Sequence, residues 1–140
     1  MKITKLLLFA ALIAVLGINV NSASGQNKSK NYVKVIYFHT DYRCATCTKL
    51  EKFSKETVSK YFSEEIESGK LKFEAINFEE ESNEHYVDEY DLYNKSLIII
   101  RYENGKKKDW KNLDKIWEYV SSKTKYYNYV KKEIKDYLKG

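Results

Sequence analysis

The chain has 140 residues, of which 43% are apolar and 15% aromatic, and its formal net charge is +5. This length and composition indicate one domain with a real core and exclude a disordered chain. Lysines and glutamates alternate along the chain with no basic stripe, so nucleic-acid binding is not expected. Two cysteines are too few for a disulfide-rich scaffold or a site with four cysteine ligands.

The N-terminal residues 1–25 have the pattern of a secretory signal peptide. Lys2 and Lys5 precede an apolar run over 6–18, and Ala23-Ser24-Gly25 fits a small-residue cleavage site. The alternative is a retained membrane anchor, but the run is shorter than the roughly 20 residues that a spanning helix needs. No cysteine follows the run, which excludes the usual lipoprotein attachment.

The expected organisation is a signal peptide over 1–25, a linker over 26–31 and one domain over 32–140. We expect the mature protein to be periplasmic or secreted, without a membrane span, and monomeric. Export would place the two cysteines in an oxidising compartment, where a disulfide persists.

Three apolar, β-branched segments predict buried strands, and a fourth strand should follow a tight turn. Asn104-Gly105 is the turn signal, because this dipeptide favours a two-residue hairpin. The predicted strands are 33–38, 71–78, 96–102 and 106–110.

Helical periodicity predicts four further segments between and after these strands. They are a long helix over 44–68, a helix within 79–93 capped by Ser82 or Asn83, a short helix after Asn112 with Leu113, Ile116, Trp117 and Val120 on one face, and a last helix over about 124–138. The order β-α-β-α-β-β-α predicts an α/β fold, with a central four-stranded mixed sheet and helices on both faces.

The motif with a clear chemical meaning is Cys44-x-x-Cys47, between a buried strand and the start of a helix. Unpaired N–H groups and the helix dipole stabilise a thiolate there, and Arg43 adds a positive charge beside it. Cys47 lies one turn further along the same side of the helix. The spacing predicts that Cys44 attacks a disulfide and that Cys47 resolves the mixed disulfide.

Two other interpretations of the cysteine pair stay open. An inert disulfide is possible, although closing so short a loop stabilises a fold only weakly. A zinc or copper site would need His39 and His85, the only histidines, to complete the ligand set. Attachment of c-type haem is excluded, because Thr48 rather than histidine follows Cys47.

The chain resembles the thioredoxin-like superfamily over about residues 32–138. The segments that carry the resemblance are Tyr37-Phe38-His39, Arg43-Cys44-x-Thr46-Cys47, Leu92-Tyr93-x-Lys95-Ser96-Leu97 and Trp110-Lys111-Asn112-Leu113. They are similar to small exported bacterial thioredoxin-like proteins that are labelled as a nitrophenyl-compound nitroreductase subunit. The resemblance implies the thioredoxin fold. No segment has the pattern of a flavin or nicotinamide site, so we expect no cofactor.

Three departures from the family affect the site. Arg43-Cys44-Ala45-Thr46-Cys47 stands where thioredoxins have Trp-Cys-Gly-Pro-Cys, and the family's buried acid maps to Tyr37 or Phe38. The position of the family's cis-proline falls on Ser96. We expect a trans peptide bond there, because a cis bond without proline costs about 2.5–4 kcal/mol.

Four residues are predicted to support the cysteine pair. Ser96 could donate a hydrogen bond, and Lys95 is either a stabiliser of the Cys44 thiolate or a solvated loop lysine. His39 is either a proton carrier or a residue that closes the loop after its strand. Tyr42 is expected at the rim of the site, in contact with a substrate.

The residues and the resemblance together predict an exported thiol–disulfide oxidoreductase whose partners are protein thiols, protein disulfides or a redox partner protein. The alternatives are a non-catalytic thioredoxin-like accessory subunit and a copper or zinc carrier. The sequence does not determine whether the protein reduces or oxidises. Stabilisation of the Cys44 thiolate favours oxidation, because a stabilised reduced form makes a stronger oxidant.

Overall fold

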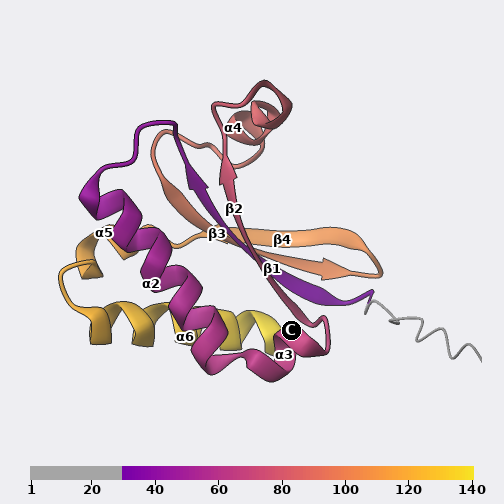
Figure 1. Ribbon diagram of the computed structural model, residues 1–140. Helices are drawn as coiled ribbons and strands as arrows, with labels where there is room; N and C mark the ends of the chain where they lie inside the picture. The colour runs from indigo at the N-terminus through magenta and orange to yellow at the C-terminus, as the bar shows by residue number, and fades with distance from the viewer. Residues whose placement is uncertain (1–29) are drawn as a thin grey trace, which may run out of the picture.

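The computed structural model describes residues 30–140, which form a four-stranded sheet with helices packed against it (Figure 1). The predicted signal peptide and most of the predicted linker lie outside the described residues. The strands are β1 (Tyr32–His39), β2 (Leu71–Asn77), β3 (Ser96–Glu103) and β4 (Lys106–Asn112). They lie in the order β2-β1-β3-β4, with β1 and β2 parallel and the other neighbours antiparallel.

Successive residues of a strand point to opposite faces of the sheet. The central strands β1 and β3 carry apolar residues on both faces, so both faces are buried. In β1, Val33, Val35 and Tyr37 point into one core, whereas Ile36 and Phe38 point into the other. β3 continues this pattern with a run of buried residues from Leu97 to Ile100. The sheet therefore separates two hydrophobic cores.

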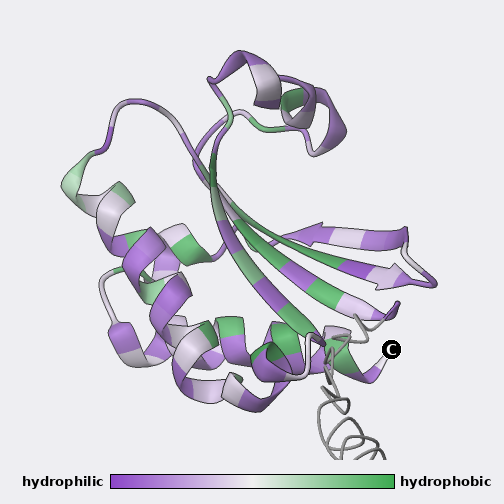
Figure 2. Ribbon diagram, turned by 45° about the vertical axis from the view of Figure 1, so that its right-hand side comes forward, coloured by the Kyte–Doolittle hydropathy of each residue, from purple (hydrophilic) through white to green (hydrophobic). Residues whose placement is uncertain are grey.

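The larger core lies under the helices α2 (Ala45–Tyr61) and α6 (Lys123–Lys139), which pack against each other and against the sheet. Figure 2 shows hydrophobic residues along the central strands and on parts of these helices. The buried residues of the two helices recur at helical spacing: Leu50, Phe53, Val58, Tyr126, Val130 and Ile134. The short helices α3 (Ser63–Glu67) and α5 (Ile116–Tyr119) complete this side.

The smaller core is covered by the short helix α4 (His85–Glu89) and the residues that follow it. The ring of Phe38 lies 5.1 Å from that of Tyr86 and 5.7 Å from that of Tyr90. Tyr90 also meets the Trp110 ring edge-on at 5.2 Å. Among residues 30–140 no long helix covers this face of the sheet, and packed aromatic rings close it instead.

Two helix predictions are wrong in detail. The predicted helix 44–68 is two helices, because the backbone leaves the helical conformation at Phe62 (φ −139°, ψ 32°), whose side chain is buried in the core. Neither Ser82 nor Asn83 caps a helix in 79–93. A 3-10 turn, η1 (Glu81–Asn83), comes first, and the Asn83 amide donates to the Asn77 carbonyl at 2.9 Å.

The hairpin prediction is confirmed, whereas the helix start at Asn112 is wrong. Asn104 and Gly105 both have positive φ, 53° and 78°, as a two-residue hairpin requires. β4 extends to Asn112, and the next helix begins only at Ile116. The backbone N–H of Leu113 still donates to the Leu97 carbonyl at 2.8 Å, so strand contacts extend past the predicted cap.

Between residues 30 and 140, no helix combines the length and the apolar character that crossing a membrane requires.

Candidate functional site

Cys44 is the N-cap residue of α2, as the sequence predicts. Its backbone is extended (φ −72°, ψ 161°), and its sulfur accepts a hydrogen bond from the Cys47 N–H at 3.0 Å. Cys44 and Cys47 form a disulfide with an S–S distance of 2.08 Å and a Cα–Cα distance of 5.0 Å. One of the free N–H groups at the helix start therefore points at the Cys44 sulfur.

The two cysteines differ in access. Cys44 is half-buried at the surface, whereas Cys47 is only 2% exposed and belongs to the core. Cys44 is therefore the residue of the pair that another molecule can contact more easily. This asymmetry matches the predicted division into an attacking and a resolving cysteine.

Tyr37 lies beneath the disulfide and holds the first turn of α2. Its hydroxyl donates to the Cys47 carbonyl at 2.8 Å, in a buried contact. Burial raises the pKa of Tyr37 to about 12, although the positive charge of Arg43 acts in the opposite direction. The phenol therefore stays neutral and remains a donor at physiological pH. Sequence reasoning placed Tyr37 at the position of the family's buried acid but missed this contact.

Arg43 forms an ion pair with Glu51, a residue of α2. Both side chains are partly exposed, at 33% and 27%. The carboxylate offsets part of the charge that Arg43 presents to its surroundings. The contribution of Arg43 to stabilising a Cys44 thiolate therefore stays a prediction.

The structure brings the side chains of Tyr42 and Lys95 together. Tyr42 is 74% exposed, and the Lys95 ammonium lies 5.7 Å from the centre of its ring. His39 is half-buried at the end of β1, with Nδ1 3.1 Å from the Thr40 carbonyl. Its ring lies 6.4 Å from that of Tyr37.

Hydrogen bonds within the fold hold the segment 94–96 in place. Ser96 is 7% exposed, and its hydroxyl donates to the Asn94 carbonyl at 2.9 Å. The indole N–H of Trp117 donates to the Lys95 carbonyl at 3.1 Å. No peptide bond in residues 30–140 is cis, as expected for the bond before Ser96. The sequence placed Trp117 only on an apolar helix face, and nothing in its spacing indicated this contact.

No group of three or more histidine, cysteine, aspartate or glutamate side chains suitable for a metal ion occurs in residues 30–140. His85 lies in α4 with its ring 4.0 Å from that of Tyr86. The histidines and the cysteine pair thus do not form a recognisable ligand cluster in the described chain.

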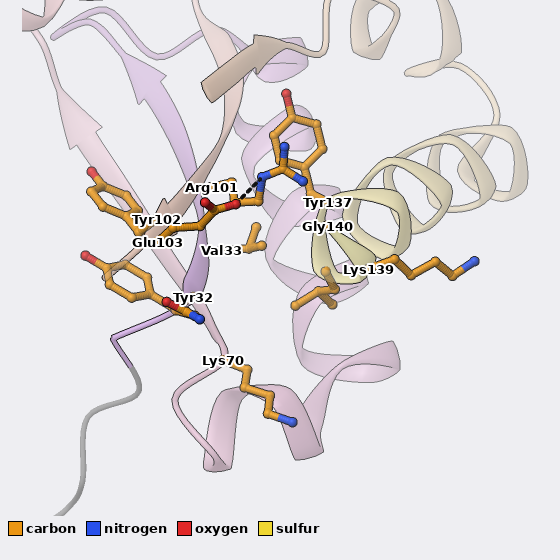
Figure 3. Close-up of a pocket in the computed structure, with 11 residues that line it drawn as sticks. Tyr32, Val33, Lys70, Arg101, Tyr102, Glu103, Tyr137, Lys139 and Gly140 are labelled. Atoms are coloured by element: carbon orange, nitrogen blue, oxygen red, sulfur yellow. Dashed lines mark ion pairs between the residues drawn. The ribbon is translucent and has the colours of Figure 1, made fainter. Parts of the chain in front are cut away.

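A hollow lies at the other end of the sheet and is shown in Figure 3. It has a volume of about 470 Å³ and lies between the start of β1, the end of β3 and the end of α6. Its arginine, Arg101, is already bound to Asp109 at 2.6 Å and lies 3.7 Å from Glu103. The charge of Arg101 is therefore compensated within the fold, whereas Lys70 and Lys139, which also line this hollow, form no ion pair among residues 30–140.

Comparison with known proteins concerns the fold alone. No family model and no curated protein matches this sequence. A thioredoxin pre-protein from Schistosoma mansoni has 19% identity and a TM-score of 0.44, and the match covers 78% of this chain and 82% of that one. Thioredoxin O2 from Arabidopsis thaliana has 14% identity and a TM-score of 0.40, with 69% and 76% covered.

A third structure, Trxlp from Edwardsiella tarda, has 15% identity and a TM-score of 0.39, with 61% of this chain and 74% of that chain covered. None of these three structures bears the nitroreductase label.

The strand order β2-β1-β3-β4, the parallel β1–β2 pair and the cysteine pair at the start of α2 define a thioredoxin-like α/β fold. The predicted fold class is confirmed: it is a mixed four-stranded sheet flanked by helices.

Proposed function

We propose that this protein is a thiol–disulfide oxidoreductase that works through Cys44 and Cys47. The observation that carries the proposal is the asymmetric pair at the start of α2, in which the half-buried Cys44 is bonded to the buried Cys47. An inert structural disulfide would gain little stability from closing so short a loop, and it would not need one accessible sulfur.

The chemistry is a two-step exchange. In the reduced protein, the Cys44 thiolate attacks one sulfur of a substrate disulfide, that S–S bond breaks, and the departing sulfur takes up a proton. The Cys47 sulfur, after losing its proton, then attacks Cys44 in the mixed disulfide and releases the second substrate thiol. Two electrons pass from the cysteine pair to the substrate, and the reverse sequence oxidises a substrate dithiol.

The contacts of the first turn support this exchange. The Cys47 N–H that points at the Cys44 sulfur stabilises a negative charge on that atom. Tyr37 fixes the Cys47 peptide from below, so the resolving sulfur stays within reach of Cys44. Tyr37 is therefore a positioning residue of the site.

We further propose that the protein acts as an oxidant. Groups that stabilise the Cys44 thiolate stabilise the reduced form and so raise the reduction potential. A redox titration against glutathione should give a potential above the roughly −270 mV of thioredoxin. A potential below that value would contradict the oxidising direction but leave the exchange itself intact.

The pattern of residues 1–25 supports the further proposal that the protein is exported to the periplasm or secreted. Expression of the full chain in a bacterial host, followed by fractionation and mass spectrometry, tests it. We expect a chain in the exported fraction that lacks about the first 25 residues. A full-length chain that stays in the cytoplasm would contradict export.

A trapping experiment tests the central proposal. In Cys47→Ser the mixed disulfide cannot be resolved, so we expect it to accumulate through Cys44 when the reduced variant meets substrate proteins. Cys44→Ser is the matched control and should trap nothing. If both variants instead copurify with the same partner, without a covalent bond, the protein is an accessory subunit rather than an oxidoreductase.

A further inference from the structure

The loops 40–44 and 94–96 lie at the same end of the sheet. β3 begins at Ser96, which pairs with Phe38 near the end of β1, and the loop toward Cys44 leaves β1 just after His39. The Lys95 ammonium consequently reaches the ring of Tyr42, two residues before Cys44. The second loop therefore borders the place where another molecule would approach the Cys44 sulfur.

Both main-chain polar groups of Lys95 are already used within the fold. Its N–H donates to the Asn94 side-chain oxygen at 2.8 Å, and its carbonyl accepts the indole N–H of Trp117 at 3.1 Å. A peptide that adds as an extra strand needs free N–H and C=O groups to pair with. Since the Lys95 N–H is occupied and its carbonyl already accepts one hydrogen bond, we infer that side chains contribute to the recognition of a partner here.

The side chains at this end of the sheet include exposed aromatic rings, two aspartates and the half-buried Lys95. Tyr42 is 74% exposed, and Tyr93 and Trp117, which line a small hollow beside Lys95, are 91% and 36% exposed. Asp91 and Asp114 line the same hollow. In residues 30–140, however, Lys95 forms no ion pair with either of them or with any other carboxylate.

We propose that Tyr42 and Lys95 form a docking surface for partners that carry an acidic group close to their disulfide, and that Trp117 positions this surface. The inference rests on the proposed thiol–disulfide exchange. An ammonium beside a tyrosine ring keeps its charge available to a second molecule, so it attracts a carboxylate near the reacting sulfur. Trp117 acts through the Lys95 backbone, which it holds from α5.

Two small disulfides of different charge test the docking surface. We would measure the exchange rate of the reduced protein with glutathione disulfide, which is anionic, and with hydroxyethyl disulfide, which is neutral. We would divide the rate with glutathione disulfide by the rate with hydroxyethyl disulfide. A change in the reactivity of the Cys44 sulfur alters both rates equally and therefore leaves this ratio unchanged. Lys95→Gln should lower this ratio about threefold, as expected for one exposed charge pair.

The same ratio of rates tests whether the hydrogen bonds that position Lys95 matter when its charge is kept. Trp117→Phe keeps an aromatic ring and leaves Lys95 in place, but it removes the indole N–H, so we expect the ratio to fall toward that of Lys95→Gln. Asn94→Ala removes the other hydrogen bond and should act in the same direction. Lys49→Gln is the matched control, because it removes a lysine charge that lies over a different aromatic ring, that of Phe53 at 5.5 Å, and it should leave the ratio unchanged.

Each outcome has a distinct meaning. If Lys95→Gln and Trp117→Phe leave the ratio at the wild-type value, or if Lys49→Gln lowers it equally, the docking surface is contradicted although the exchange stands. If wild-type exchange with hydroxyethyl disulfide is no faster than that of Cys44→Ser, the proposed function itself is contradicted. The rate with the neutral disulfide also shows whether each variant keeps an intact site.

Discussion

The two ends of the sheet differ in how their polar groups are used. At one end lies the larger hollow, about 470 Å³, whose arginine is bound to an aspartate and faces a tyrosine ring at 5.7 Å. At the other end lies a hollow of only about 220 Å³, beside exposed aromatic rings, a lysine without an ion pair in the described chain, and the disulfide of the half-buried Cys44. The difference teaches that the size of a hollow says less about its chemistry than the presence of a reactive group nearby, which here is the cysteine pair.

The largest expected effect separates the two ends by activity. Cys44→Ser removes the attacking sulfur and should lower disulfide exchange by roughly a thousandfold or more, because nucleophile losses have effects of this size. Arg101→Gln, at the other end, should leave the exchange rate unchanged. The measurement is reduction of a protein disulfide by each reduced variant, and a large loss in Arg101→Gln would contradict the assignment of function to one end.

The buried tyrosine beneath the disulfide predicts a loss of stability in alkaline solution. The pKa of Tyr37 is about 12 in the folded protein because of burial, compared with 10.0 for an unperturbed tyrosine. Below pH 10 the phenol is neutral in both states, and between pH 10 and 12 the unfolded chain loses a proton that the folded protein keeps. The free energy of unfolding should therefore fall across this range, with Tyr37 contributing about 2 kcal/mol.

Tyr37→Phe checks this contribution by urea unfolding at pH 9 and pH 11. At pH 9 the variant should be about 1 kcal/mol less stable, because the Cys47 carbonyl loses its donor. Its further loss between pH 9 and pH 11 should be smaller than that of the wild type. An equal alkaline loss in both proteins would mean that other groups, such as Tyr129, whose pKa is also raised to about 12 by burial, account for the effect.

At the opposite end, the arginine network should affect stability but not exchange. Arg101→Gln leaves Asp109 without its partner at 2.6 Å, and both side chains are partly buried. We expect the free energy of unfolding to fall by about 1–2 kcal/mol. Urea unfolding measures this, and an unchanged midpoint would show that the ion pair is as weak as an exposed one.

The smallest expected effect comes from the hairpin, which lies at the same end as Arg101. Gly105 has φ 78°, and a Cβ at this position would meet no atom within 4 Å, so only backbone strain opposes a side chain. Gly105→Ala should cost about 1 kcal/mol of stability, without any change in exchange. Lys106→Ala, at the next position, is the control and should leave the unfolding midpoint nearly unchanged.

The sheet was predictable because its information is local. Alternation in Val33–Phe38, the apolar run from Leu97 to Ile100 and the positive φ that Asn104-Gly105 favours all lie within a few neighbouring residues. The helix start at Cys44 was predictable for the same reason. Together these segments predicted the four strands and the position of the cysteine pair at the start of a helix, whereas the strand order came from the structure.

The parts that could not be predicted depend on contacts between distant residues. Phe62 interrupts a helix pattern because its side chain packs into the core formed by other segments. The Tyr37 hydroxyl meets a carbonyl ten residues away, and the Trp117 indole meets one that is 22 residues away. Neither spacing belongs to a local pattern, so residue types alone indicated burial but not the partner.

The central claim is that Cys44 is an accessible thiolate and Cys47 a buried resolving thiol. The most direct measurement is the rate at which iodoacetamide alkylates each cysteine of the reduced protein as a function of pH, with the site identified by mass spectrometry. We expect Cys44 to react first, with an apparent pKa below the roughly 8.5 of a free cysteine, while Cys47 stays protected. Equal rates at the two cysteines, with an apparent pKa at or above that value, would contradict the account.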